Sequence, residues 1–364
     1  MEDIVKIPIK NIYYLLCYAW DIAIYNVDKS CGSEEFSNIY NLLGRMLCDD
    51  VDTLIKRGFY KGYIDQVEST SRLKGQINIS DSINQMTILK KQMICCYDDY
   101  SSNVLFNQII KSTLIDFLKV PYLDKDICKK IKKLICYFDD VNYIYVTNRI
   151  FYSLRFNRNN RNYQRIINVC KLFRFGLIAN ENGNDFKFLG FIEENYMNKI
   201  YEKFILNFYN HHLDHKKYRV HAPNVEWKLD KNIVNNLDDY FFIEEEPGNR
   251  RTDIVIENKI DNIELTLDAK YYKDMLVKKY MSDGKMTYRT SHLNQVRGYV
   301  LDSKFNGQKY GGLIYPTVNE NEKYEKGMLI PISGSYIIIK SLNLNQEWCD
   351  IEKDLVSFAA NIIK

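Results

Sequence analysis

The chain has 364 residues, of which 46% are hydrophobic and 27% charged, so a disordered or low-complexity protein is excluded and two domains of ordinary size are expected. Its 50 basic and 47 acidic residues give a formal net charge of +3. Because this overall charge does not indicate a nucleic-acid-binding protein, any DNA contact has to be argued from local patches.

The cysteine and hydrophobicity patterns indicate a cytoplasmic protein with reduced thiols. Nine cysteines are present, and none forms a C-x-x-C pair. The N-terminus lacks the basic and apolar regions of a signal peptide. The apolar stretch 12–25 is interrupted by Asp21 and is shorter than the roughly 20 residues of a membrane span. We therefore expect no contact with a membrane.

The N-terminal half combines helices with a strand-rich insertion. Four stretches place apolar residues at helical spacing and are expected to be helices: 11–25, 36–57, 103–118 and 163–172. Residues 60–79 contain Gly62, Gly75 and an alternating pattern, which is typical of short strands and turns. We predict a mixed α+β domain over residues 1–185.

The C-terminal half has the rhythm of an α/β domain. The Asn-, Gly- and Asp-rich segment 180–185 is the clearest internal turn or linker signal. Beyond it, helices are expected at 193–212, 292–301 and 346–363, and strands at 253–257, 263–271, 311–315 and 335–339. We predict an α/β domain over residues 186–364.

Charged residues end the otherwise apolar strand 263–271. Because alternate side chains of a strand share a face, Asp268 and Lys270 project to one side and the apolar residues to the other. If the strand 253–257 pairs antiparallel with it, Asp253 lies beside Asp268. Two converging carboxylates suit Mg²⁺, which polarises a phosphoryl oxygen and lowers the pKa of bound water. A neighbouring lysine can orient that water or stabilise charge on the phosphate.

This combination of an Asp, a strand hairpin and an Asp-x-Lys resembles the active site of the PD-(D/E)xK nucleases. The resemblance implies catalytic roles for Asp253, Asp268 and Lys270, and it implies that the backbone carbonyl of Ala269 is a further metal ligand. The alternative is a surface hairpin with incidental charges, since a bare Asp-x-Lys is frequent by chance.

Three further residues are candidates for accessory roles. Gln295 and Tyr299 fall at i and i+4 on an expected helix and therefore on one face, and such a pair recurs in part of this nuclease superfamily. Glu202 is a candidate for the extra acid that some members supply from their first helix. The alternatives are a solvated Gln295, a core Tyr299 and an exposed helical Glu202.

The sequence also resembles the McrC family over nearly its whole length. The stretches that carry the resemblance are 7–20 (IPIKNIYYLLCYAW), 73–77 (LKGQI), 107–114 (NQIIKSTL), 267–273 (LDAKYYK), 311–316 (GGLIYP) and 342–348 (LNLNQEW). Asp253, Asp268 and Lys270 fall on the catalytic positions of that family.

The McrC resemblance implies an endonuclease subunit of a modification-dependent restriction system. Family members cleave double-stranded DNA with Mg²⁺ in complex with McrB, an AAA+ motor that hydrolyses GTP and recognises modified cytosine, and they stimulate its GTPase. Residues 1–185 would dock onto the motor ring, and residues 186–364 would form a restriction-endonuclease-like domain with a central mixed sheet. The chain has no G-x-x-x-x-G-K-[ST] motif, so GTP is expected on the partner. The alternative is a non-catalytic regulator that assembles and stimulates the AAA+ ring.

Two local basic patches are candidates for binding. The first lies between residues 153 and 171, where no acidic residue occurs, and its arginines are Arg155, Arg158, Arg161 and Arg165. Three interpretations are open for this patch: contact with DNA, contact with an acidic surface of the motor ring, or a solvated basic face. The second follows the catalytic strand and is expected to grip DNA phosphates. Its members are Tyr271, Tyr272, Lys273, Lys278, Lys279 and Arg289.

Overall fold

The computed structural model describes residues 7–21, 38–181, 194–227, 248–271, 276–278, 286–318, 326–332 and 334–363. The chain divides into two compact units. The first unit combines Met1–Glu35 with Ile192–Lys364, and the second unit is Phe36–Phe191.

The second unit is a helical bundle. Its helices are α3 (Ile39–Arg57), α5 (Leu105–Phe117), α6 (Lys125–Ile135), α7 (Asn148–Ser153) and α8 (Tyr163–Glu181). Helix α3 packs against α6 and α8, and α5 packs against α8. At the centre the buried rings of Phe117 and Phe173 stack with their centroids 3.7 Å apart. This aromatic contact closes the core of the bundle.

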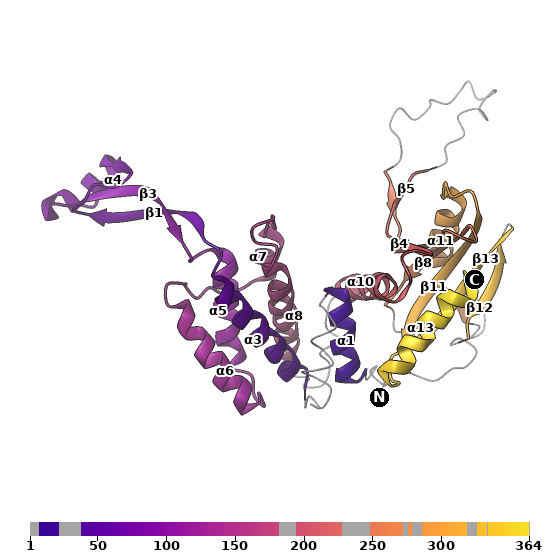
Figure 1. Cartoon of the computed structure of the whole chain (residues 1–364). Helices are drawn as coiled ribbons and strands as arrows, with labels where there is room; N and C mark the ends of the chain where they lie inside the picture. Colours follow the sequence, from indigo (N-terminus) through magenta and orange to yellow (C-terminus); the bar gives the residue numbers. More distant parts are fainter. Residues whose placement is uncertain are drawn as a thin grey trace, which may run out of the picture. The chain divides into compact units, whose positions relative to one another are not determined.

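A β-sheet arm, Gly62–Ser101, projects from this bundle (Figure 1). Strands β1 (Gly62–Thr70) and β3 (Met93–Ser101) pair antiparallel along their whole length, and β2 (Gln76–Asn78) pairs with the other edge of β3. A short helix α4 (Ile79–Asn84) and a 3₁₀ turn η2 (Thr87–Lys90) connect β2 to β3. No residue of β1 is buried, so the arm is held by its ladder of backbone hydrogen bonds more than by a core.

The first unit is built on a six-stranded mixed sheet of order β12-β13-β11-β8-β7-β4. These strands are β4 (Tyr218–His221), β7 (Ile254–Asn258), β8 (Ile263–Ala269), β11 (Gln308–Thr317), β12 (Met328–Ile332) and β13 (Ser335–Asn343). The central strands β8, β11 and β13 are parallel, and the other pairs are antiparallel. Two small ladders join β5 (Asn224–Val225) to β6 (Arg250–Arg251), and β9 (Leu276–Lys278) to β10 (Met286–Tyr288).

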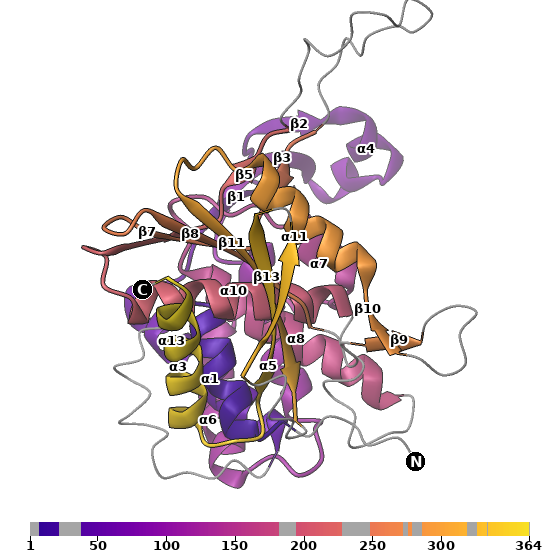
Figure 2. The same ribbon diagram turned by 90° about the vertical axis from the view of Figure 1, so that its right-hand side faces the viewer.

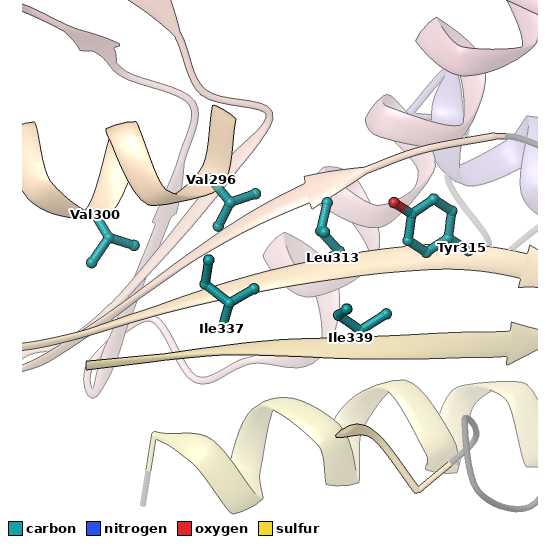
Figure 3. Packing of buried hydrophobic residues seen from close by; sticks show 6 residues of the cluster. All are labelled: Val296, Val300, Leu313, Tyr315, Ile337 and Ile339. Atoms are coloured by element: carbon teal, nitrogen blue, oxygen red, sulfur yellow. The ribbon is translucent and has the colours of Figure 1, made fainter. Parts of the chain in front are cut away.

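Helix α11 (Thr290–Asp302) runs alongside strands β11 and β13 (Figure 2). Val296 and Val300 of the helix lie over a buried apolar cluster from the two strands (Figure 3). This cluster consists of Leu313, Tyr315, Ile337 and Ile339. Gly311 allows the close approach, because a Cβ at this position would lie 2.5 Å from Val296 Cγ1.

Helix α1 (Ile9–Ala19) belongs to the first unit, which differs from the expected division at residue 185. It packs against α10 (Glu194–His212). The Tyr18 hydroxyl lies 2.7 Å from His212 Nε2, and Asn11 Nδ2 donates to the carbonyls of Leu344 and Gln346 at 2.9 and 2.8 Å. The sequence predicts that this helix belongs with its neighbours in the chain. In the structure, however, Asn11 and Tyr18 form hydrogen bonds with residues more than 180 positions away.

Most other expected elements form close to their predicted bounds, including the last helix α13 (Trp348–Ile362). The helix expected at 163–172 continues to Glu181 into the expected linker 180–185, of which residues 182–185 lie outside the described residues. The longest elements of the second unit that were not predicted are β3 and α6. Strand β3 carries Asp98 and Asp99 among its apolar residues, and α6 buries only Ile127, Ile131 and Leu134 in a Lys-rich sequence. No helix among the described residues combines the length and apolarity needed to span a bilayer.

Replacing Gly311 by Ala should destabilise the first unit by about 1–3 kcal/mol, because the new methyl group overlaps Val296 and forces α11 away from β11. All three tryptophans, Trp20, Trp227 and Trp348, lie in this unit, so chemical unfolding followed by tryptophan fluorescence reports on it. The matched control is Gly248→Ala, where a Cβ meets nothing within 4 Å. Equal midpoints for the two variants would contradict the packing argument.

Candidate active site

The register of β7 and β8 brings Asp253 beside Asp268. Ile254 lies opposite Leu267 in this antiparallel pair, so the residue before Ile254 lies opposite the residue after Leu267. Asp253 Oδ2 accepts a hydrogen bond from the backbone N–H of Ala269 at 3.1 Å. The predicted antiparallel pairing of these strands is therefore confirmed.

Asp268 is fully buried, and Lys270 is its nearest cation among the described residues. Lys270 Nζ lies 3.0 Å from Asp268 Oδ1, and the lysine side chain is 13% exposed. Neither carboxylate oxygen of Asp268 accepts a hydrogen bond of regular geometry from the described part of the chain. A carboxylate left in this state is costly unless a cation compensates it.

Burial and the charge of Asp253 raise the pKa of Asp268 to about 8. Burial acts to lower the pKa of Lys270, but the charges of Asp268 and Asp253 outweigh it, and the pKa of Lys270 is raised. Lys270 is therefore an ammonium ion at neutral pH, whereas Asp268 holds a proton until further positive charge arrives.

Helix α10 adds a third carboxyl group, that of Glu202, near Asp253 and Lys270. Burial and the charge of Asp253 raise the pKa of Glu202 to about 7, and Lys270 lowers it in part. One turn earlier, Asn198 Oδ1 accepts a hydrogen bond from the backbone N–H of Tyr271 at 2.6 Å, which ties α10 to the end of β8. Glu202 is half-buried, so it is not the exposed helical residue of the alternative interpretation.

Gln295 and Tyr299 lie on one face of α11, as their spacing predicts. Gln295 Nε2 donates to Tyr299 Oη at 2.9 Å, and Tyr299 Oη donates to the carbonyl of Arg251 at 2.9 Å. Burial raises the pKa of Tyr299, and the charges of Asp268 and Asp253 raise it further. The tyrosine therefore belongs to the surroundings of the acidic pair, and the glutamine fixes its hydroxyl.

His292 is a neighbour of the site that the sequence did not indicate. Its Nδ1 shares a hydrogen bond of 2.8 Å with Tyr315 Oη, and the ring is buried. Burial and the nearby charge of Lys270 lower the pKa of His292 to about 4, so the ring is neutral at pH 7. A lone histidine on a helix gives no signal in a sequence, because only the fold brings it next to β11.

The second basic patch is only partly described. Tyr272, Lys273 and Lys279 lie outside the described residues, and for Lys278 only the backbone is described, opposite Met286 in the β9–β10 ladder. Tyr271 packs edge-on against Tyr201 with ring centroids 5.9 Å apart, and burial raises its pKa to about 12. Tyr271 is half-buried, with one side of its ring against Tyr201, and its contact with DNA stays a prediction. Arg289 immediately precedes α11.

The first basic patch has fewer unpaired arginines than its sequence indicates. Arg165 forms an ion pair with Asp50, in which Nε donates to Oδ2 at 2.7 Å, and Asp50 is buried. Its charge is therefore used inside the bundle. Arg155, Arg158 and Arg161 are exposed on the segment before α8. These three remain candidates for binding.

The donor types at the site, the carboxyl oxygens of Asp253 and Asp268, are of the kind that a magnesium ion accepts. No group of three or more His, Cys, Asp or Glu side chains that could hold a metal occurs within the described ranges. Asp253 and Asp268 offer carboxylate oxygens, and Ala269 offers a backbone carbonyl. Mg²⁺ retains several waters and is commonly held by one or two carboxylates, whereas structural Zn²⁺ requires four protein ligands.

The fold and site define an α/β domain with a buried Asp–Asp–Lys cluster, joined to a helical unit with an exposed arm. Residues 8–316 match the family described as McrBC 5-methylcytosine restriction system component, and the chain belongs to this family. The resemblance to McrC is therefore confirmed.

Two relatives extend this comparison. The chain is 28% identical over 365 residues to the protein of Escherichia coli K12 described as "Type IV methyl-directed restriction enzyme EcoKMcrBC", covering 98% of this chain and 99% of that protein. Its fold is similar, with a TM-score of 0.52 and 15% identity, to a chain in the structure "Refined half-complex from tetradecameric assembly of Thermococcus gammatolerans McrB AAA+ hexamers with bound McrC". That likeness covers 98% of this chain and 76% of the other, so the fold is shared across both units.

Substitution of Asp268 by Asn should make the first unit more stable at pH 8, on the order of 2 kcal/mol, and little different at pH 4. The unfolded carboxyl group ionises near 3.8, whereas the folded one keeps its proton to about 8, so rising pH destabilises the wild-type fold between these values. Unfolding midpoints across pH 4–8, read by tryptophan fluorescence, measure the difference.

The opposite sign is expected for Lys270→Met. This substitution leaves the buried carboxyl group of Asp268 and the half-buried one of Asp253 without their cation, and it should destabilise the unit by roughly 3 kcal/mol at pH 8, with a smaller loss at pH 4. If both variants changed stability in the same direction at pH 8, the charge balance described for this site would be wrong.

Proposed function

We propose that this chain is the DNA endonuclease subunit of a McrBC-like, modification-dependent restriction complex, and that its first unit is a PD-(D/E)xK nuclease domain. The observation that carries the proposal is the convergence of Asp253, Asp268 and Lys270 at the end of a mixed sheet. Membership in the restriction family supports it independently of the geometry.

Asp253, Asp268 and the carbonyl of Ala269 are the groups that would hold Mg²⁺. When bound, the ion supplies Lewis acidity toward a phosphoryl oxygen and toward the attacking water. The buried carboxyl group of Asp268, which has Lys270 as a cation within 3.0 Å, supports this assignment, because further positive charge beside it favours the ionised carboxylate.

The remaining residues have separate roles in phosphodiester hydrolysis. Lys270 stays protonated beside the carboxylates and stabilises the negative charge that develops on the phosphate. Glu202, with a pKa raised to about 7, is suited to accept or release a proton near neutral pH. Tyr299, oriented by Gln295, confines the acidic pair on the side of α11.

The second unit is the docking module for a McrB-like AAA+ partner that binds GTP. The support is the arm, whose far end carries apolar side chains that a folded monomer would not leave in water without purpose. Ile79 is 60% exposed, Met86 66% and Leu89 81%. The relative of known structure is described as McrB AAA+ hexamers with bound McrC. Double-stranded DNA with modified cytosine is the proposed substrate, and its recognition is assigned to the partner.

Asp268→Ala should reduce cleavage of methylated DNA at least a hundredfold while leaving stimulation of the partner's GTPase intact. The measurement uses the complex with the co-expressed AAA+ partner, GTP and Mg²⁺. Asp350→Ala is the matched control, because this aspartate is exposed and pairs only with Lys353 among the described residues. A wild-type complex that never cuts methylated DNA would favour the alternative, a non-catalytic regulator of the ring.

Leu89→Asp should abolish GTPase stimulation and association with the partner, because it places a charge on the apolar end of the arm. Size-exclusion chromatography and GTP turnover measure the two effects. Tyr137→Asp is the control, since Tyr137 is a 53% exposed residue of the same unit outside the arm. Full stimulation by the Leu89 variant would remove the arm from the docking surface.

A further inference from the structure

A cavity of about 600 Å³ lies in the second unit, where the arm joins the helical bundle. Its size is within the range of small-molecule sites. It is bounded by the end of α3 with the loop that follows, by the first residues of the arm and by the segment before α8. None of the residues that line it is acidic.

The floor of the cavity is fixed by a closed set of hydrogen bonds. The buried Tyr163 hydroxyl accepts from the backbone N–H of Tyr60 at 2.8 Å and donates to Asn107 Oδ1 at 2.8 Å. Asn107 Nδ2 in turn donates to the carbonyl of Tyr60 at 3.0 Å. Gly58 turns the chain into this loop with φ of +88°, a conformation that favours glycine. The cavity is therefore formed before any ligand arrives.

Aromatic rings and cations surround the opening. Tyr63 and Tyr100 face each other across β1 and β3 with ring centroids 5.2 Å apart, and they are 76% and 58% exposed. Arg57 and Lys61 line the same cavity, and neither forms an ion pair with any described residue. Their charges are thus available for an anion.

The segment before α8 adds hydrogen-bonding groups of both kinds. The side-chain amides of Asn159 and Asn162 line the cavity and make no hydrogen bond to the described part of the chain. An amide presents a donor and an acceptor together, which is the pattern of a base edge. Arg158 and Arg161, exposed on the same segment, add positive potential around the opening.

We propose that this cavity binds a nucleotide, either free or as an unstacked residue of a single strand. The tyrosine rings stack on the base, the asparagine amides hydrogen-bond to its edge, and Arg57 and Lys61 contact phosphate. An acidic peptide would use the cations, and its backbone would pair with the amides, but it would leave the exposed tyrosine rings without a flat base to stack on. The inference goes beyond the proposed nuclease function, which places DNA on the other unit.

The test uses the full chain without a partner and with EDTA, so that neither docking nor cleavage contributes. Anisotropy of a fluorescent six-nucleotide DNA strand is measured as a function of salt. Tyr63→Ala should weaken binding about tenfold without changing the salt dependence, because it removes stacking alone. Arg57→Gln should weaken binding and lower the slope of log K against log salt by about 0.7, the value of one phosphate contact on a single strand.

Two matched controls should behave as wild type. Lys56→Gln removes the same charge one residue away, where the lysine pairs with Asp52 outside the cavity. Tyr137→Ala removes another exposed tyrosine of the same unit, one that does not line the cavity. Displacement of the strand by GMP or GTP identifies a free nucleotide as ligand, and displacement by oligonucleotides alone identifies a strand; both support the proposal.

Equal affinities of wild type, Tyr63→Ala and Arg57→Gln for the strand would overturn the proposal, as would absence of binding to both the strand and the mononucleotides. If the wild-type chain binds no nucleotide and the two variants no longer bind the AAA+ partner, the cavity is assigned to protein docking instead. None of these outcomes changes the proposed nuclease function, because that function rests on the Asp268 site of the first unit.

Discussion

The antiparallel register of β7 and β8 is the constraint on which the candidate site depends. It places Asp253 against Asp268 at the end of a sheet, where burial and the charge of Asp253 both oppose ionisation of Asp268. Lys270 balances only part of this charge. Helix α11 approaches β11 closely at Gly311 and carries Tyr299, whose pKa responds to the charges of the acidic pair, so the same helix packs on the sheet and borders the site.

The two units distribute their apolar residues in opposite ways. In the first unit, β8 is buried along nearly its whole length, and it carries the buried carboxyl groups of Glu264 near its start and Asp268 near its end. In the second unit, the bundle has a core around Phe117 and Phe173, while the arm leaves large apolar side chains such as Leu89 in solvent. A rigid buried site suits chemistry, and an exposed ladder-held arm suits association. The small net charge fits such a division, because no large surface has to attract DNA alone.

Local periodicity predicted the elements that carry the site. The alternation in β8 placed Asp268 and Lys270 on one face, and the i, i+4 spacing placed Gln295 beside Tyr299; the structure has both arrangements. The strand β3 and the helix α6 were missed because their apolar residues are few and interrupted by charges. The position of α1 was missed for a different reason, since Asn11 and Tyr18 have partners near the other end of the chain.

By itself, the sequence determined the helices and strands that carry the site, the family and the residue types available for chemistry, because these follow from short-range patterns and from shared motifs. Only the tertiary structure decided which charges are free. Arg165 pairs with the buried Asp50, the charge of Lys270 acts on His292, and the half-buried Tyr271 packs against Tyr201. Burial, register and ion pairing between distant segments set the pKa of each group and the shape of each cavity, and no local pattern encodes them.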